Sequence, residues 1–154
     1  MKTRHATPED VAEMSRFLQH LAALGKRISP TSEAFVLQQY VDHPDNIQCT
    51  VVEDDDGTLM GFQILKCAAE NNIYDVTPGW GIIGTHVRPD AARRGVGRKL
   101  FAETQKAAQR AGLQKIDASI SAENAEGLAY YDAIGFQTYR TPAGTICKCF
   151  DVSA

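Results

Sequence analysis

The sequence predicts a single α/β domain in which helices pack on a mixed β-sheet. Its 154 residues match the usual size of one domain. The 44% of hydrophobic and 23% of charged residues are typical of a chain that folds around a core. Short β-branched segments alternate with segments whose apolar residues recur at helical spacing. This order of elements predicts the α/β class over residues 1–154.

The first half of the chain is expected to contain a strand, two helices and a hairpin. Thr7-Pro8 offers a capping hydroxyl and a proline at the first helical position, and Gly25 ends the apolar periodicity that follows. The run Asp54-Asp55-Asp56-Gly57 contains an Asp-Gly hairpin turn, and a solvated tip is favoured there because a calcium loop would need further ligands at fixed spacing. The expected elements are a strand over 2–6, helices from Pro8 to Gly25 and from Ser32 to about Asp42, and strands over 47–52 and 59–67.

The second half is expected to continue with strands and two longer helices. Residues 80–87 contain no carboxylate or lysine, which favours a strand in the interior of the sheet. Gly112 and Gly135 stand where helix ends are expected. The remaining elements are a helix from near Arg94 past Arg110, a strand over 115–120, a helix over 124–134, and a closing pair of strands over 136–140 and 145–150.

Composition excludes several classes of partner. The formal net charge of −3 argues against a surface that coats nucleic acid. The sequence has no apolar run long enough to span a membrane, and its start lacks the apolar segment of a signal peptide, so we expect a soluble cytoplasmic protein without a membrane partner. The four cysteines form no C-x-x-C motif, so we expect reduced thiols and no metal site.

The segment from Val87 to Leu100 has the composition of a phosphate-binding loop. Glycines followed by a helix start let the backbone approach an anion, and the first N–H groups of a helix have no partner within it. An ordinary helix start with a solvated basic turn is the alternative. A Walker loop and a dinucleotide fingerprint are both excluded by the spacing. The candidate binding residues are Arg93, Arg94, Gly95, Val96, Gly97, Arg98 and Lys99.

A second candidate pair lies in the helix expected over 124–134. Asn124 and Tyr131 are seven residues apart, or two helical turns, so one helix face can present an amide and a phenol to a ligand. The alternative is that Asn124 caps the helix and Tyr131 is an aromatic residue of the core.

These motifs resemble those of the Gcn5-related N-acetyltransferase (GNAT) superfamily. Val87-Arg88-Pro89 and Gly95-Val96-Gly97 fall at the spacing of its acetyl-CoA loop, and Asn124 to Phe136 looks like its Asn-x(6)-Tyr-x(3)-Gly-Phe pattern. One position departs from the family, because Ala92 stands where Arg or Gln is usual. The resemblance covers residues 80–136 by motif and the whole chain by order of elements.

The resemblance implies a fold and a reaction. The fold is a mixed, mostly antiparallel sheet of about seven strands flanked by about four helices and splayed between strands four and five. The implied activity is transfer of acetyl from acetyl-CoA, a co-substrate, to the primary amine of a small molecule by direct attack in a ternary complex. The acceptor could instead be a protein N-terminus or lysine, and a non-catalytic acyl-CoA sensor is the alternative outside enzymes. Thr85, His86 and Val87 would contact the pantetheine arm, and Asn124 and Tyr131 would also contact the cofactor.

The resemblance also assigns catalytic roles. Tyr131 is the candidate acid for the departing thiolate, because a phenol is protonated at neutral pH. His86 is the candidate base, although it faces away from Gly81 and Ile83, the usual base positions. A water chain ending at Glu70 or Asp75, or an amine of low pKa, would also serve.

Two further expectations concern the acceptor and the assembly. Acceptor selection is expected to come from residues 25–31 and 68–79 and from the turn around Pro142 and Gly144. A homodimer is expected from the family, with Thr145–Phe150 as a candidate pairing edge.

Overall fold

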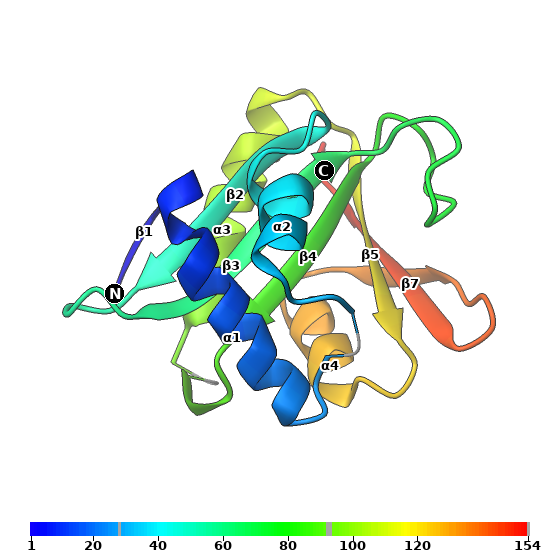
Figure 1. Cartoon of the computed structure of the whole chain (residues 1–154). Coiled ribbons are helices and arrows are strands. Elements are labelled where there is room, and N and C mark those ends of the chain that lie inside the picture. The colour runs from blue at the N-terminus through cyan, green and yellow to red at the C-terminus, as the bar shows by residue number, and fades with distance from the viewer. Residues whose placement is uncertain (28, 92–93, 154) are drawn as a thin grey trace.

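The computed structural model describes residues 1–27, 29–91 and 94–153, and it confirms the predicted α/β fold. Its seven-stranded sheet has the order β1-β2-β3-β4-β5-β7-β6, and β4 with β5 is the parallel pair in an otherwise antiparallel sheet (Figure 1). The strands are β1 (Lys2–His5), β2 (Asn46–Glu53), β3 (Leu59–Cys67), β4 (Gly81–Val87), β5 (Lys115–Ser121), β6 (Gln137–Arg140) and β7 (Thr145–Asp151). The helices are α1 (Val11–Ala23), α2 (Glu33–Val36), α3 (Val96–Arg110) and α4 (Ala125–Ala133).

The helices cover both faces of the sheet. On one face, α1 and α2 bury Met14, Leu18 and Val36 against the β3 residues Phe62 and Ile64. The opposite face carries α3 and α4, whose apolar side chains share a core with alternate residues of β3, β4 and β5. Because side chains alternate along a strand, neighbouring residues of β3 and β4 face different layers. The two faces of β4 therefore present different chemistry.

The sheet opens between β4 and β5, as predicted. These strands pair at two positions, Gly81 with Ile116 and Ile82 with Asp117. Beyond them β4 continues to pair with β3 as far as Val87, while β5 pairs with β7. Figure 1 shows β4 and β5 diverging, with α4 between their ends in this view. The splay leaves one side of β4 without a strand partner from Ile83 onward.

The expected pairing edge at Thr145–Phe150 is wrong. β7 lies between β5 and β6 and pairs with both, because the chain returns through β6 before β7 enters the sheet. The edges of the sheet are β6 and β1.

Two local expectations have clear outcomes. The helix predicted over 32–42 begins with Ser32, whose Oγ accepts the N–H of Phe35 at 3.2 Å, but it continues after Val36 as a π-helical segment, Leu37–Val41. The tip of the β2–β3 hairpin is held by its own aspartates, since Asp54 Oδ1 accepts the N–H of Thr58 at 3.0 Å. No helix in the described parts of the chain is long and apolar enough to cross a membrane.

Candidate active site

A buried polar network lies where β3, β4, α3 and α4 meet. Its centre is Gln63 of β3, which is fully buried. The Gln63 Nε2 donates to Thr85 Oγ1 at 2.9 Å and to Tyr130 Oη at 3.0 Å, while Thr104 Oγ1 donates to Gln63 Oε1 at 2.5 Å. Thr85 Oγ1 in turn lies 2.8 Å from Tyr131 Oη. The network links the predicted acid, Tyr131, to three elements of the fold.

Tyr131 is held as a neutral phenol. Its ring packs against Phe136 and Tyr130, with centroid separations of 5.0 and 4.9 Å. Burial raises the pKa of Tyr131 well above its usual value, and the hydrogen bond with Thr85 acts in the opposite direction. The side chain therefore keeps its proton throughout the neutral range, as a general acid requires.

The backbone of β4 offers free groups to the splayed gap. Arg88 N donates to Met60 O, and Ala68 N donates to Trp80 O, so even-numbered positions along β4 form the hydrogen-bonded pairs with β3. The N–H and C=O groups of Thr85 and Val87 consequently point away from β3, toward the gap. Those of His86 point to β3. Of the three residues predicted to contact pantetheine, two present backbone groups where an extended ligand could lie.

His86 lies on the other face of β4, against Phe62 of β3 and Tyr40 of the π-helical segment. Its ring centroid is 4.9 Å from that of Phe62 and 5.7 Å from that of Tyr40. Burial, with a smaller effect from the charge of Arg27, lowers the pKa of His86 to about 3. A neutral imidazole in these surroundings is a poor proton acceptor, and it faces away from Thr85 and Tyr131. Its predicted role as base gains no support from this geometry.

The start of α3 carries the predicted phosphate loop. Gly95 is the N-cap with φ +82°, a left-handed conformation that favours glycine. Arg94, Arg98 and Lys99 are exposed, and Val96 is buried as an anchor for the first turn. Arg93 lies outside the described residues. A hollow of about 240 Å³ adjoins this helix start, lined by Arg98, Phe101, Ala102, Gln105, Ala133 and Ile134 of α3 and the end of α4.

Gly97 is required by packing within the protein. A Cβ at this position would lie 2.5 Å from Cε1 of Tyr130, and Tyr130 Oη donates to Gly97 O at 2.8 Å. The sequence pattern predicted a glycine that lets a phosphate approach the backbone, and the contact with Tyr130 was not predicted. The available signal was Tyr130 beside Tyr131, two aromatic residues in one helical turn.

Asn124 occupies the N-cap of α4. Its Oδ1 accepts the N–H of Gly127 at 3.0 Å, and its side chain is exposed. Tyr131 is buried near the opposite end of the same helix. The capping role predicted as the alternative for Asn124 is confirmed, while a contact with cofactor stays a prediction.

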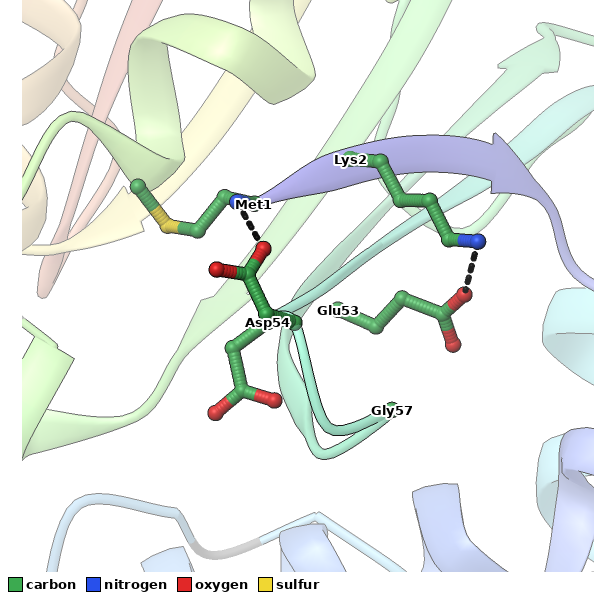
Figure 2. A pocket seen from close by; sticks show the side chains of 6 residues that line it. Met1, Lys2, Glu53, Asp54 and Gly57 are labelled. Carbon is green, nitrogen blue, oxygen red and sulfur yellow. Dashed lines mark hydrogen bonds and ion pairs between the residues drawn. The ribbon is translucent and has the colours of Figure 1, made fainter.

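Another surface hollow lies elsewhere. It measures about 310 Å³ and is formed by β1 and the β2–β3 hairpin, with Met1, Lys2, Glu53, Asp54, Asp55 and Gly57 as its lining (Figure 2). Its walls are held by two ion pairs, from the Met1 amino group to Asp55 at 3.4 Å and from Lys2 to Glu53 at 3.7 Å. None of the residues of the Gln63 network lines it. Among the described residues, no cluster of three or more His, Cys, Asp or Glu is arranged to hold a metal ion.

Comparison with known proteins identifies the family of this chain. The family model of the Acetyltransferase (GNAT) family matches residues 14–136. The chain belongs to this family. As a GNAT enzyme it is an acetyl-CoA-dependent N-acetyltransferase. None of the curated proteins compared matches the sequence significantly.

Solved structures of GNAT enzymes share the fold over nearly the whole chain. The ribosomal-protein-S18-alanine N-acetyltransferase of Escherichia coli has a TM-score of 0.74 at 18% identity, covering 99% of this chain and 94% of that chain. A spermidine N-acetyltransferase SpeG chimera from Vibrio cholerae and hSSAT has a TM-score of 0.71 at 17% identity, covering 99% and 98%. The YncA structure from Salmonella typhimurium, which contains its cofactor acetyl-CoA, has a TM-score of 0.69 at 19% identity, covering 99% and 94%.

Proposed function

We propose that this GNAT enzyme is a single-domain catalyst that acetylates the primary amine of a small molecule by direct attack in a ternary complex. The observation that carries the proposal is the position of Tyr131. It is a neutral phenol of α4, and it is hydrogen-bonded to Thr85 of β4, the strand that borders the splayed gap. A domain that only binds acyl-CoA would have no use for a proton donor there.

The acyl donor fits two features of the fold. The pyrophosphate would lie at the start of α3, where Arg94, Arg98 and Lys99 supply positive charge and the first-turn N–H groups supply donors. The pantetheine arm would follow β4, hydrogen-bonded to the free backbone groups of Thr85 and Val87. The start of α3 combines backbone N–H groups with basic side chains, and β4 offers backbone groups, so the two features together suit a largely extended ligand.

The proposed reaction forms a C–N bond and breaks a C–S bond. The amine nitrogen attacks the thioester carbonyl, the C–S electron pair leaves on sulfur, and Tyr131 Oη gives its proton to that sulfur. The ammonium formed on nitrogen loses a proton to the base. Direct attack needs the amine and thioester held together, so the binding of both substrates supplies much of the rate enhancement.

Three groups are candidates for the base. His86 is neutral and poorly basic on the far face of β4. Glu70 and Asp75 are exposed in the segment before β4, so a water chain ending at either is compatible with the fold. An acceptor amine of low pKa would arrive neutral and need no strong base.

The acceptor is proposed to enter beside the α1–α2 connection. Lys26 Nζ lies 2.8 Å from Glu126 Oε1, so this connection touches the first turn of α4, the helix that carries Tyr131. The names of the neighbouring structures include both a small polyamine and a protein amino group as acceptors. A protein N-terminus or lysine is therefore the second candidate.

The test measures free thiol released from acetyl-CoA with a panel of acceptors: amino acids, polyamines, an N-terminal peptide and a lysine peptide. We expect turnover with a small amine, and a fall of about 10²- to 10⁴-fold in Tyr131→Phe, the usual value of general acid catalysis. Acetyl-CoA at 100 times its Kd should also stabilise the wild type by about 2.7 kcal/mol. Stabilisation without turnover of any acceptor would favour a sensor, and no stabilisation would contradict the binding site.

A homodimer and a cytoplasmic location also stay predictions. With β7 in the interior, pairing between sheets would have to use β6 or β1. Sedimentation at micromolar concentration that shows only a 16.8 kDa species would contradict the dimer.

A further inference from the structure

We propose that Gln63 and Thr85 are positioning residues that fix the direction of hydrogen bonding at Tyr131, so that the proton of Tyr131 is free for the leaving thiolate. The proposal rests on the proposed role of Tyr131 as the acid. It assigns a function to a buried glutamine and a threonine that otherwise read as parts of the sheet.

The orientation of the Gln63 amide follows from its neighbours. Tyr130 has one hydroxyl proton, and the carbonyl oxygen of Gly97, 2.8 Å away, can only accept. Tyr130 therefore donates to Gly97, and the Gln63 atom that faces Tyr130 Oη at 3.0 Å has to be the donor, Nε2. The Oε1 atom of Gln63 then accepts a hydrogen bond from Thr104, so both ends of the amide have partners.

The same counting fixes the direction at Thr85. Its Oγ1 accepts the second N–H of Gln63 at 2.9 Å. The Tyr130 hydroxyl also lies near Thr85, but it already accepts from Gln63 and donates to Gly97. The single proton of Thr85 is therefore directed to the Tyr131 Oη at 2.8 Å. Thr85 thus donates to Tyr131, and the proton of Tyr131 points away from Thr85. Within the described residues it has no acceptor, which suits a group that waits for a ligand.

This direction matters when the thioester breaks. Tyr131 loses its O–H bond, the leaving sulfur gains an S–H bond, and negative charge develops on the phenol oxygen. The Thr85 hydroxyl already points at that oxygen, and Gln63 prevents it from turning away. Hydrogen bonds to a developing charge are stronger than those to a neutral group, so their effect is expected in kcat rather than in the binding of acetyl-CoA.

The experiment is a double-mutant cycle between Thr85 and Tyr131, with the better acceptor of the panel and saturating acetyl-CoA. Thr85→Val keeps the shape and removes the hydroxyl, and we expect kcat to fall about 10- to 100-fold with little change in the KM of acetyl-CoA. Thr85→Ser is the matched control and should retain most of kcat. In the Tyr131→Phe background Thr85→Val should cost nothing further, because the residue acts through the phenol.

The outcomes separate this inference from the proposed function. If Tyr131→Phe reacts as fast as the wild type, the acid role and this inference are both wrong. If Tyr131→Phe is slow but Thr85→Val is not, or if Thr85→Val costs the same factor in both backgrounds, only the inference is wrong. Thermal melts check folding of each variant. If Thr85→Val does not fold, the same cycle is measured with Gln63→Met, which removes the N–H donor that orients Thr85, and the same outcomes apply.

Discussion

Substituting Gly97 by alanine tests whether α3 is shaped by Tyr130 or by a ligand. The new Cβ would lie 2.5 Å from Cε1 and 3.1 Å from Cδ1 and Cζ of the Tyr130 ring. A tyrosine ring is rigid, and this one is also fixed by hydrogen bonds to Gly97 O and from Gln63. The ring has to move, and the hydrogen bond to Gly97 is expected to break with it.

The cost can be assembled from three contributions. Overpacking in a filled interior costs about 1–3 kcal/mol. Loss of one hydrogen bond adds about 0.5–1.5 kcal/mol. The higher helix propensity of alanine returns up to about 1 kcal/mol. The net loss is about 0.5–4.5 kcal/mol, and for a chain of this length it lowers Tm by about 1–18 °C.

The assay is thermal and urea unfolding of Gly97→Ala in the wild type and in Tyr130→Ala. In the second background the space is open, so the substitution should be neutral or slightly stabilising. Gly84→Ala is the matched control, since the nearest atom to its Cβ, Ile64 Cδ1, is 3.9 Å away. An equal loss in both backgrounds, with no ligand present, would refute the packing explanation. If Gly97→Ala weakens acetyl-CoA binding and Tyr130→Ala does not restore it, the glycine is required because the ligand approaches the backbone there.

Three other outcomes are expected. Burial lowers the pKa of His86 in the folded chain to about 3, so the unfolded chain takes up a proton at His86 at a higher pH than the folded chain does. The contribution of His86 to the free energy of unfolding should therefore be fully present above about pH 6.5 and decrease by up to about 1.4 kcal/mol per pH unit toward pH 3. Urea melts of His86→Gln should show a flatter pH profile of stability than those of the wild type. Asn124→Ala should lose about 1 kcal/mol with the α4 cap while Asn124→Ser retains it, and equal melts for both would contradict the cap. Burial raises the pKa of Cys49 to about 12, so mass spectrometry should find this thiol unalkylated in folded protein at pH 8 and modified after unfolding.

Local patterns predicted most of the elements, because capping and turn residues act within a few positions. Ser32 caps its helix and Gly95, with positive φ, begins α3, as their residue types suggest. The neighbours of a strand are set by contacts between distant segments, which periodicity does not contain. Thr145–Phe150 was therefore predicted as a strand correctly and placed at an edge wrongly.

The motifs predicted some residues of the candidate site, but the contacts that depend on packing between distant segments were not predicted. Tyr130 meets Gly97 across 33 positions of sequence, and nothing near either residue indicates the contact. Gln63 was visible as a polar residue inside the apolar run of β3, from Leu59 to Leu65. A glutamine at such a position needs buried partners, so it should have been read as part of a site.

The two adjacent tyrosines of α4 provide the sharpest internal control for the acid. Tyr131 is buried and Tyr130 is partly buried, and burial raises the pKa of Tyr130 to about 12 and that of Tyr131 well above its usual value. They differ in where their protons go, because Tyr130 donates to Gly97 O, whereas Tyr131 receives a hydrogen bond from Thr85 and keeps its own proton free. Tyr130→Phe should therefore lower stability by about 1 kcal/mol and leave kcat far less changed than Tyr131→Phe. If Tyr130→Phe instead causes the larger fall in kcat at equal folding, the proton at the active site comes from Tyr130, and the direction of hydrogen bonding derived from Gly97 is wrong.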